Sequence, residues 1–396
     1  MAQILFLVTL FVTLAPIYEA KSFKALVAPI RQLNPSTFVY TITLNQKEKL
    51  VIDLESPYSW HHCSKSSPHV SCNVKQCYIA RKNQPPCLLQ SPKTSCITSP
   101  SNLISNSSAS SYLSYTNVSI AYTDGHVPFA KANYKLFLSC APKSLLNSRP
   151  IGSSGFASFS SSSLSLVKQF SNSKVPKKFA MCLGEQGVAF FGEGPFYLLP
   201  PPGRDITRLL SSTPLITHPS DSLGYYIGLK GISINGEAIK SLRSMLPFVK
   251  LVKLSTITPY TTLRSDLYRA VIRQFSKATR GIPRVPNVAP FGLCLNTSNL
   301  GSTRVGLPVP QIDLQLIEGG NWTIFGANSM LQVSNDAHCL AFVNGGKRAE
   351  QAVVIGTYQM QHNFLLFDLV RFELGFSSLL FFFQTTCNNF NFTSGV

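Results

Sequence analysis

The sequence predicts a mostly β protein built of two lobes, and three observations lead to this fold class. Most of the chain consists of short β-branched or aromatic runs, such as residues 38–44 and 363–368, separated by Gly, Pro, Ser and Asn. Helix signals are few: residues 265–275 have a polar start and apolar residues at helical spacing, and 163–170 is a shorter candidate. A chain of 396 residues is also too long for a single hydrophobic core and suits two.

The first segment, residues 1–20, is predicted to be a secretory signal peptide. An apolar run from Ile4 to Phe11, interrupted only by Thr9, is too short to cross a bilayer, and the segment ends in Ala20 before Lys21. We therefore expect a secreted, extracellular protein with no membrane span. A second apolar run, residues 379–383, stops at Gln384. We expect it to form a buried or interfacial strand rather than a membrane anchor.

Two similar segments indicate an internal repeat. Residues 50–56 form an apolar run that contains the carboxylate of Asp53, and residues 251–257 repeat the hydrophobic approach with the hydroxyl of Ser255 at the matching position. A Val-Val-Ile-Gly run at 353–356 is a further part of this internal repeat. We expect an N-terminal lobe over residues 21–199 and a C-terminal lobe over 223–396. The Pro-rich and then polar stretch 200–222 would connect them.

Several unusual motifs occur in a fixed order along the chain. They are Trp-His-His-Cys at 60–63, Phe-Phe-Gly-Glu-Gly-Pro at 190–195, Gly-Tyr-Tyr-Ile-Gly-Leu at 224–229, Val-Pro-Gln-Ile-Asp-Leu at 309–314, Trp-Thr-Ile-Phe-Gly at 322–326 and Leu-Gly-Phe-Ser at 374–377. Together they resemble the plant family of basic 7S globulins, gamma-conglutins and xyloglucan-specific endoglucanase inhibitor proteins, with the wheat xylanase inhibitors as more distant relatives. The resemblance covers about residues 23–396. It implies a pepsin-like fold, secretion, many disulfides and no proteolysis.

The same resemblance predicts a degenerate active site. Aspartic protease chemistry needs two carboxylates that share one proton, and Asp53 lacks its partner because Ser255 aligns with the second aspartate. Active members place a small hydroxyl residue and then Gly after each Asp. Glu55 and Ile257 stand at the Gly positions here, which predicts strain or a different loop shape. Glu55 cannot replace the lost carboxylate, because it sits on the same loop as Asp53. Both positions are therefore relics, and no catalytic residue is intact.

Other chemistries find little support in the sequence. The Gly-Ser-Ser-Gly run at 152–155 is one residue short of the spacing of a nucleophile elbow, and 192–194 lacks the third glycine of a dinucleotide loop. His61, His62 and His338 lie beside cysteines without a second pair of ligands, and we expect them to be loop residues. We accordingly expect no metal and no cofactor.

Ten cysteines follow the signal segment, and an even number in a secreted chain predicts a disulfide framework. Zinc is the competing interpretation, but no pair has the two-residue spacing of a zinc knuckle. Connectivity does not follow from the sequence; the pairs that we expect are Cys294 with Cys339 and Cys182 with Cys387. The full set is Cys63, Cys72, Cys77, Cys87, Cys96, Cys140, Cys182, Cys294, Cys339 and Cys387.

Five Asn-X-Ser/Thr sequons predict surface positions and at least one glycan. They lie at Asn106, Asn117, Asn296, Asn321 and Asn391.

The chain is basic, with 35 Lys and Arg against 17 Asp and Glu and a net charge of +18. In a secreted protein this balance argues against nucleic acid as a partner. It favours acidic cell-wall polysaccharide, acidic proteins or anionic membrane surface. General adhesion by dispersed charge explains the composition as well as a dedicated patch does.

The function that these observations favour is inhibition of microbial glycoside hydrolases of the endoglucanase or xylanase class, in plant cell-wall defence. In the inhibitors, a cation enters the carboxylate-lined cleft of the target. Residues 302–305 resemble one inhibitory segment, so Arg304 is the leading contact. The second contact would precede Gln384, where inhibitors tend to carry Arg and this chain has Phe383, which either stacks in a sugar subsite or is buried. The alternatives are a seed storage or peptide-binding globulin and an active aspartic endopeptidase.

Overall fold

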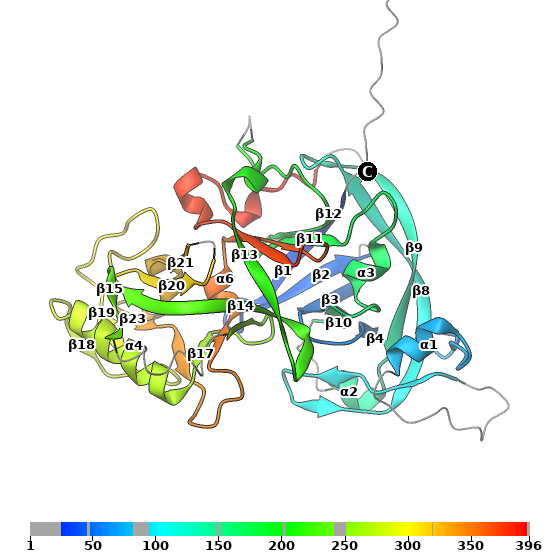
Figure 1. The fold of residues 1–396 in the computed structure, drawn as a ribbon, viewed down its shortest axis with the longest axis horizontal. Coiled ribbons are helices and arrows are strands. Elements are labelled where there is room, and N and C mark those ends of the chain that lie inside the picture. Colours follow the sequence, from blue (N-terminus) through cyan, green and yellow to red (C-terminus); the bar gives the residue numbers. More distant parts are fainter. Residues whose placement is uncertain are drawn as a thin grey trace, which may run out of the picture.

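A computed structural model describes residues 25–45, 48–81, 95–147, 150, 152–200, 203–240, 251–318 and 320–393 of the chain. It confirms the predicted fold class: the protein is mostly strand and has two lobes in a pepsin-like arrangement (Figure 1). No helix in these ranges is long and apolar enough to cross a membrane.

The N-terminal lobe is a sheet structure with three short helices. A long hairpin, β8 with β9, curves along its outer side (Figure 1) and pairs from Leu113 with Ser139 to Thr123 with Pro128. The strands are β1 (Ala25–Asn34), β2 (Val39–Leu44), β3 (Glu48–Asp53), β4 (Trp60–His61), β5 (Ile97–Thr98), β6 (Ser101–Asn102), β7 (Ser107–Ser108), β8 (Ser111–Thr123), β9 (Pro128–Cys140), β10 (Gly155–Ser158), β11 (Lys178–Cys182) and β12 (Val188–Gly192). The helices are α1 (Lys75–Ala80), α2 (Lys143–Asn147) and α3 (Leu166–Phe170).

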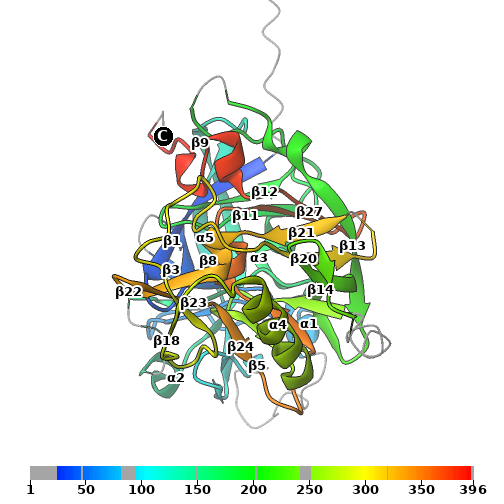
Figure 2. The same ribbon diagram turned by 90° about the vertical axis from the view of Figure 1, so that its left-hand side faces the viewer.

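A 3₁₀ turn, η1 (Ile206–Leu209), and the strand β13 (Ser211–His218) lead to the C-terminal lobe. That lobe carries the longest helix of the described residues, α4 (Ser265–Ala278), on its outer side (Figure 2). Its other elements are β14 (Asp221–Ile234), β15 (Glu237–Ala238), β16 (Leu251–Leu254), β17 (Thr261–Leu263), β18 (Arg284–Val285), β19 (Cys294–Asn296), β20 (Ile312–Leu316), β21 (Asn321–Ile324), α5 (Gly326–Ser329), β22 (Met330–Ser334), β23 (Ala337–Leu340), β24 (Phe342–Asn344), β25 (Val353–Ile355), α6 (Thr357–Met360), β26 (Phe364–Asp368), β27 (Glu373–Phe376), η4 (Leu380–Phe383) and η5 (Cys387–Asn389).

One antiparallel sheet is shared by the two halves of the chain. Its order is β1, β12, β11, β26, β27 and β13, so that a strand of residues 178–182 pairs directly with one of residues 364–368. Both faces are covered: Phe179 and Phe191 point into the main core, whereas Phe190 and Phe364 point into a second core under the C-terminal segment. A sheet that is buried on both faces explains why these strands are continuously apolar rather than alternating.

The predicted elements are mostly present. Residues 265–275 lie in α4, α3 covers the second half of the 163–170 candidate, and 38–44 and 363–368 correspond to β2 and β26. The expected strand at 379–383 is wrong. Those residues form the 3₁₀ turn η4, in which Leu380 is buried while Phe382 is exposed, and Gln384 then reverses the chain with a φ of 58°.

Four disulfides are described, and the two predicted pairs, Cys182–Cys387 and Cys294–Cys339, are confirmed. The others are Cys63–Cys140 and Cys77–Cys96 in the N-terminal lobe. Cys72 is also disulfide-bonded, and Cys87 lies outside the described residues.

Candidate functional site

Two loops of related shape meet between the lobes, and each follows the end of a buried strand. In the N-terminal lobe β3 runs parallel to β10 and ends at Asp53, which lies opposite Ser158. In the C-terminal lobe β16 runs parallel to β25, and Ser255 follows directly. The repeat in the sequence therefore corresponds to a repeat in the structure. In each lobe the strand before the loop pairs in parallel with another strand, and in the C-terminal lobe that strand is formed by residues 353–355.

The side chain of Asp53 is completely buried and held by three donors. Its carboxylate accepts hydrogen bonds from the backbone N–H of Glu55 at 2.8 Å, from that of Ser56 at 3.2 Å, and from the Ser56 hydroxyl. Burial raises the pKa of Asp53 from 3.8 to about 6; the hydrogen bond from Ser56 opposes this rise, and the nearby charge of Glu55 adds to it. A buried acid so enclosed has no direct access to a substrate.

Ser255 occupies the matching position with a hydroxyl. Its Oγ accepts from the backbone N–H groups of Ile257 and Thr258, both at 3.4 Å, which is the same pattern that surrounds Asp53. The expected backbone strain is absent. Neither Glu55 nor Ile257 has a positive φ, and both loops form hydrogen-bonded turns with ordinary backbone angles. The second loop presents a hydroxyl where the first presents a carboxylate.

A hydrogen bond runs from the C-terminal loop to the end of the strand that precedes the N-terminal loop. The Thr256 hydroxyl donates to the carbonyl of Ile52 across the lobes at 2.7 Å. The corresponding position in the N-terminal loop is Leu54, whose side chain has no group to donate in return. The link that remains is therefore one-sided.

An ion cluster spans the lobes beside this bond. Lys253 Nζ lies 2.8 Å from a carboxylate oxygen of Glu55 and 2.9 Å from one of Asp221, and the Tyr226 hydroxyl donates to Asp221 at 2.7 Å. Burial alone would lower the pKa of Lys253, but the two carboxylates raise it above its ordinary value. The carboxylate of Glu55 is thus held in an ion pair with Lys253.

Sequence reasoning missed this cluster. Lys253 was visible as a charge within an otherwise apolar run, which is an unusual place for a lysine. Its partners lie 198 residues away at Glu55 and in the connection before the second lobe at Asp221, and nothing in the sequence brings them together.

Arg304 lies at the tip of a tight turn. Thr303 and Gly306 exchange backbone hydrogen bonds of 2.8 and 3.2 Å around it, and Gly306 has a φ of 93°, which favours glycine. The arginine is exposed and forms no ion pair with any residue that the structure describes. The turn is anchored by a hydrogen bond from the Ala327 N–H in α5 to the Val305 carbonyl.

Phe383 is half-buried against the second core and lines a hollow of about 240 Å³. The lining also includes Phe382, Gln384 and the exposed Arg204, which comes from the segment before η1. The sequence has no cation directly before Gln384, but the fold brings the guanidinium of Arg204 into the same hollow. Sequence reasoning did not identify Arg204.

The Arg304 turn and the Phe383 segment converge on α5. Phe325, the residue before α5, contacts the ring of Phe382, and the two ring centroids are 5.0 Å apart. Within α5, the Ala327 N–H donates a hydrogen bond to the carbonyl of Val305, which belongs to the Arg304 turn. Figure 2 shows the yellow loops beside α5 close to the red turns of the C-terminal segment. The two predicted contact segments thus belong to one region of the surface.

The remaining predicted positions are spread over the molecule. Asn106, Asn117 and Asn321 are exposed, whereas Asn296 and Asn391 are half-buried. His61 and His338 lie in strands rather than loops: His61 pairs with Glu48, and His338 hydrogen-bonds the Thr297 hydroxyl at 2.7 Å. No group of His, Cys, Asp and Glu side chains in the described ranges is arranged to hold a metal ion.

Comparison with known proteins agrees with this geometry. The family models "Xylanase inhibitor N-terminal" and "Xylanase inhibitor C-terminal" match residues 38–193 and 224–378. The chain is 40% identical to a protein named Chitinase CLP from Oryza sativa subsp. japonica, over 93% of this chain and 92% of that one. It is 36% identical to Gamma conglutin 1 from Prunus dulcis, over 91% and 88%, and 36% identical to Probable aspartic proteinase GIP2 from Nicotiana benthamiana, over 97% and 96%.

Solved structures show the same fold. The crystal structure of edgp superposes with a TM-score of 0.85 at 34% identity, and covers 94% of this chain and 99% of its own. Basic 7S globulin from soybean superposes with a TM-score of 0.79 at 25% identity, covering 94% and 100%.

Proposed function

Because the chain belongs to the xylanase-inhibitor-like family of pepsin-like proteins, we propose that it is a secreted, non-proteolytic inhibitor of microbial glycoside hydrolases of the endoglucanase or xylanase class, acting at the plant cell wall. The observation that carries this proposal is Arg304: its guanidinium is exposed at the tip of an anchored turn and forms no ion pair within the described part of the chain.

A guanidinium in that position suits the cleft of a glycoside hydrolase. Two carboxylates flank the scissile bond in most such enzymes, and arginine binds carboxylate through two parallel hydrogen bonds. The hollow lined by Phe383 and Arg204 offers an aromatic face and a second cation in the same region. An inhibitor with this surface would occupy the cleft with charge opposite to that of the catalytic pair.

Proteolysis and glycoside hydrolysis by this chain itself are both disfavoured by the old cleft. A dyad needs two carboxylates, and the second position is the hydroxyl of Ser255. In most families, hydrolysis of a glycoside also needs two free carboxyl groups, whereas Asp53 is enclosed and Glu55 is paired with Lys253. Relatives named as a chitinase and an aspartic proteinase make both assays necessary. Acid proteolysis that disappears in Asp53→Ala would contradict the proposal.

The decisive experiment measures inhibition of a panel of microbial endoglucanases and xylanases. Arg304→Ala should weaken the inhibitory complex by roughly 2–5 kcal/mol, because the partner carboxylates would stay buried and unpaired. Arg304→Lys should recover part of this loss, since lysine keeps the charge but not the planar fork. Phe383→Arg should strengthen binding by adding a cation at the second contact.

The matched control is Arg348→Ala, which removes another exposed arginine of the same lobe and should leave inhibition unchanged. Equal losses in Arg304→Ala and Arg348→Ala would mean that net charge, and not this turn, drives binding. If no hydrolase of the panel binds, the alternative of a seed storage or peptide-binding globulin becomes the better proposal, and the chain's similarity to a gamma conglutin and a basic 7S globulin supports it.

A further inference from the structure

We propose that the outer face of α4 is a binding site for acidic polysaccharide, separate from the Arg304 region. The site is a hollow of about 710 Å³ at the C-terminal end of the helix. Four of its lining residues are basic and none is acidic; with them come Gln274, Ser276, Ile282 and Pro283. The basic residues are Arg273, Lys277, Arg280 and Arg284.

The helix presents these charges as a consequence of its amphipathic pattern. Leu267, Val271 and Phe275 are buried against the lobe, so the opposite side of the helix faces solvent; α4 lies at the left-hand end of the molecule in Figure 1 and in front of it in Figure 2. Arg273 and Lys277 are one turn apart on that side, and both are exposed. At a rise of about 1.5 Å per residue, Arg273 and Lys277 lie about 6 Å apart along the axis, and Arg280 and Arg284 continue the basic lining beyond the end of the helix.

Arg284 is held in place at the end of this row. Its guanidinium donates to the carbonyls of Ser276 and Thr279 at 2.8 and 3.3 Å, and to the Thr279 hydroxyl at 3.0 Å. These hydrogen bonds satisfy carbonyl groups at the end of α4, so the Arg284 side chain caps the C-terminus of the helix. Arg273 and Arg280 make no such hydrogen bonds and no ion pair with any residue that the structure describes.

One acidic residue approaches the row. Glu237 accepts a hydrogen bond from Gln274 at 2.9 Å and lies 3.7 Å from Lys277 Nζ. Both charged side chains of this pair are more than half exposed, so the pair is weak and screened by water. The row therefore keeps a strong positive potential.

The chemistry of the lining selects the class of ligand. A row of separated cations suits a polymer with a repeating negative charge better than it suits a single phosphate. Arginine favours carboxylate, which is the acidic group of a uronic acid. Ile282 and Pro283 give the hollow an apolar wall for the C–H faces of a sugar ring, and no aromatic residue lines it for stacking of nucleotide bases. A polyuronate meets all of these conditions.

The test measures binding of an oligogalacturonate by calorimetry at low salt. The variant Arg273→Gln/Lys277→Gln/Arg280→Gln should bind at least about 10-fold more weakly, whereas a control that removes three exposed lysines of the N-terminal lobe, Lys65→Gln/Lys75→Gln/Lys174→Gln, should change affinity less than about twofold. Glutamine keeps helix propensity and Arg284 keeps the cap, so both variants should fold, which circular dichroism checks.

Two further ligands make the result specific. The fully methyl-esterified oligomer, which has the same sugar but no charge, should bind at least about 10-fold more weakly to the wild type. Polyglutamate of equal charge should also bind more weakly, because it lacks sugar faces. The proposal is overturned if both triple variants lose affinity equally, if the wild type binds no oligogalacturonate, or if polyglutamate binds as tightly. None of these results depends on glycoside hydrolase inhibition.

Discussion

At the scale of single residues, Asp53 is enclosed by its own loop. Three donors from that loop surround its carboxylate, and the matching position of the other lobe carries the hydroxyl of Ser255. The sequence predicted its isolation, because Ser255 is visible by alignment of the two segments. It did not predict that Glu55 and Ile257 would fit the old loop without strain, since the backbone angles at those positions depend on the surrounding sheet.

The raised pKa of Asp53 gives a pH-dependent test. Its folded value of about 6 exceeds the ordinary 3.8, so its contribution to stability is complete below pH 3.8 and is lost as the pH rises through 6. In the Asp53→Asn variant the side chain does not ionise, so this pH-dependent loss of stability is absent. The unfolding free energy of the variant should therefore gain on that of the wild type by on the order of 2–3 kcal/mol between pH 4 and pH 7, as measured by urea titration.

Two comparisons keep this result interpretable. Burial lowers the pKa of His362 to about 4, which favours the folded state as the pH rises towards 6.5, but His362 is present in both proteins and cancels in the difference. Asp336→Asn, on an exposed turn, is the matched control and should show no such trend. A difference between Asp53→Asn and wild type that stays constant with pH would mean that Asp53 does not hold a proton in this window.

At the scale of elements, the sequence predicted the elements whose formation depends on neighbouring residues in the chain. Helix α4 was predicted because a polar start and apolar spacing are encoded within its own residues. The approach of β16 to β3 through Lys253 and Glu55 was not predicted, because it depends on how the lobes are brought together. The same holds for Arg204 beside Phe383, whose neighbourhood is created by the shared sheet.

The pair of Lys253 and Glu55 should couple the two loops energetically. We expect a double-mutant cycle with Glu55→Gln and Lys253→Met to give a coupling of about 1–3 kcal/mol in unfolding free energy, more than a surface pair, because both side chains are largely buried. Lys253→Met should be the more damaging single change, since it leaves both Glu55 and Asp221 without their cation. Purely additive single changes would show that the cluster does not hold the lobes together.

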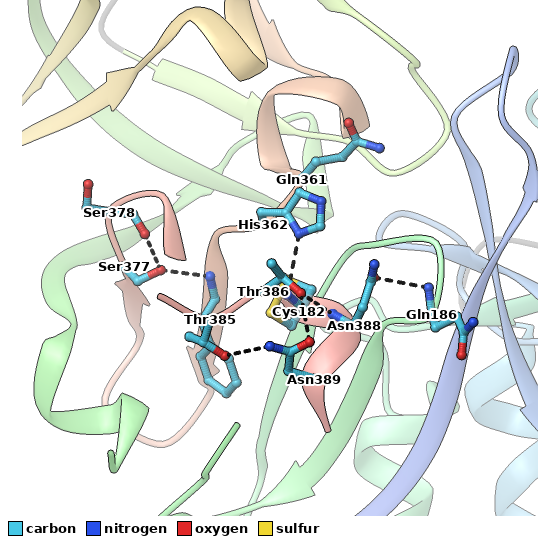
Figure 3. The surroundings of a disulfide bond; sticks show 12 residues. Cys182, Gln186, Gln361, His362, Ser377, Ser378, Thr385, Thr386, Asn388 and Asn389 are labelled. Carbon is cyan, nitrogen blue, oxygen red and sulfur yellow. Dashed lines mark hydrogen bonds between the residues drawn. A yellow bond between two sulfur atoms is a disulfide. The ribbon is translucent and has the colours of Figure 1, made fainter. Parts of the chain in front are cut away.

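At the scale of the whole molecule, the C-terminal segment closes the structure. The Cys182–Cys387 disulfide joins β11 to η5, and hydrogen bonds from Gln186 to Asn388 at 3.2 Å and from Cys387 to His362 at 3.4 Å surround it (Figure 3). The order of motifs indicated the two-lobe fold, whereas the cysteine pairing was an expectation that the sequence alone does not determine and that the structure confirms. The fold positions the segment that bears Phe383 directly over the second core.

This closure predicts which crosslink matters most for stability. Cys182 and Cys387 are 205 residues apart in sequence, whereas Cys77 and Cys96 are 19 apart. On the chain-entropy account, removing the first crosslink costs about 5 kcal/mol and removing the second about 3 kcal/mol. Denaturant unfolding of Cys182→Ser/Cys387→Ser should therefore show a larger loss than Cys77→Ser/Cys96→Ser. The first variant should also lose hydrolase inhibition below the temperature at which it unfolds, because the Phe383 segment would be untied while the Arg304 turn stays anchored to α5. A larger loss of stability in the second variant would mean that loops of the N-terminal lobe, and not the closing of the chain, limit stability.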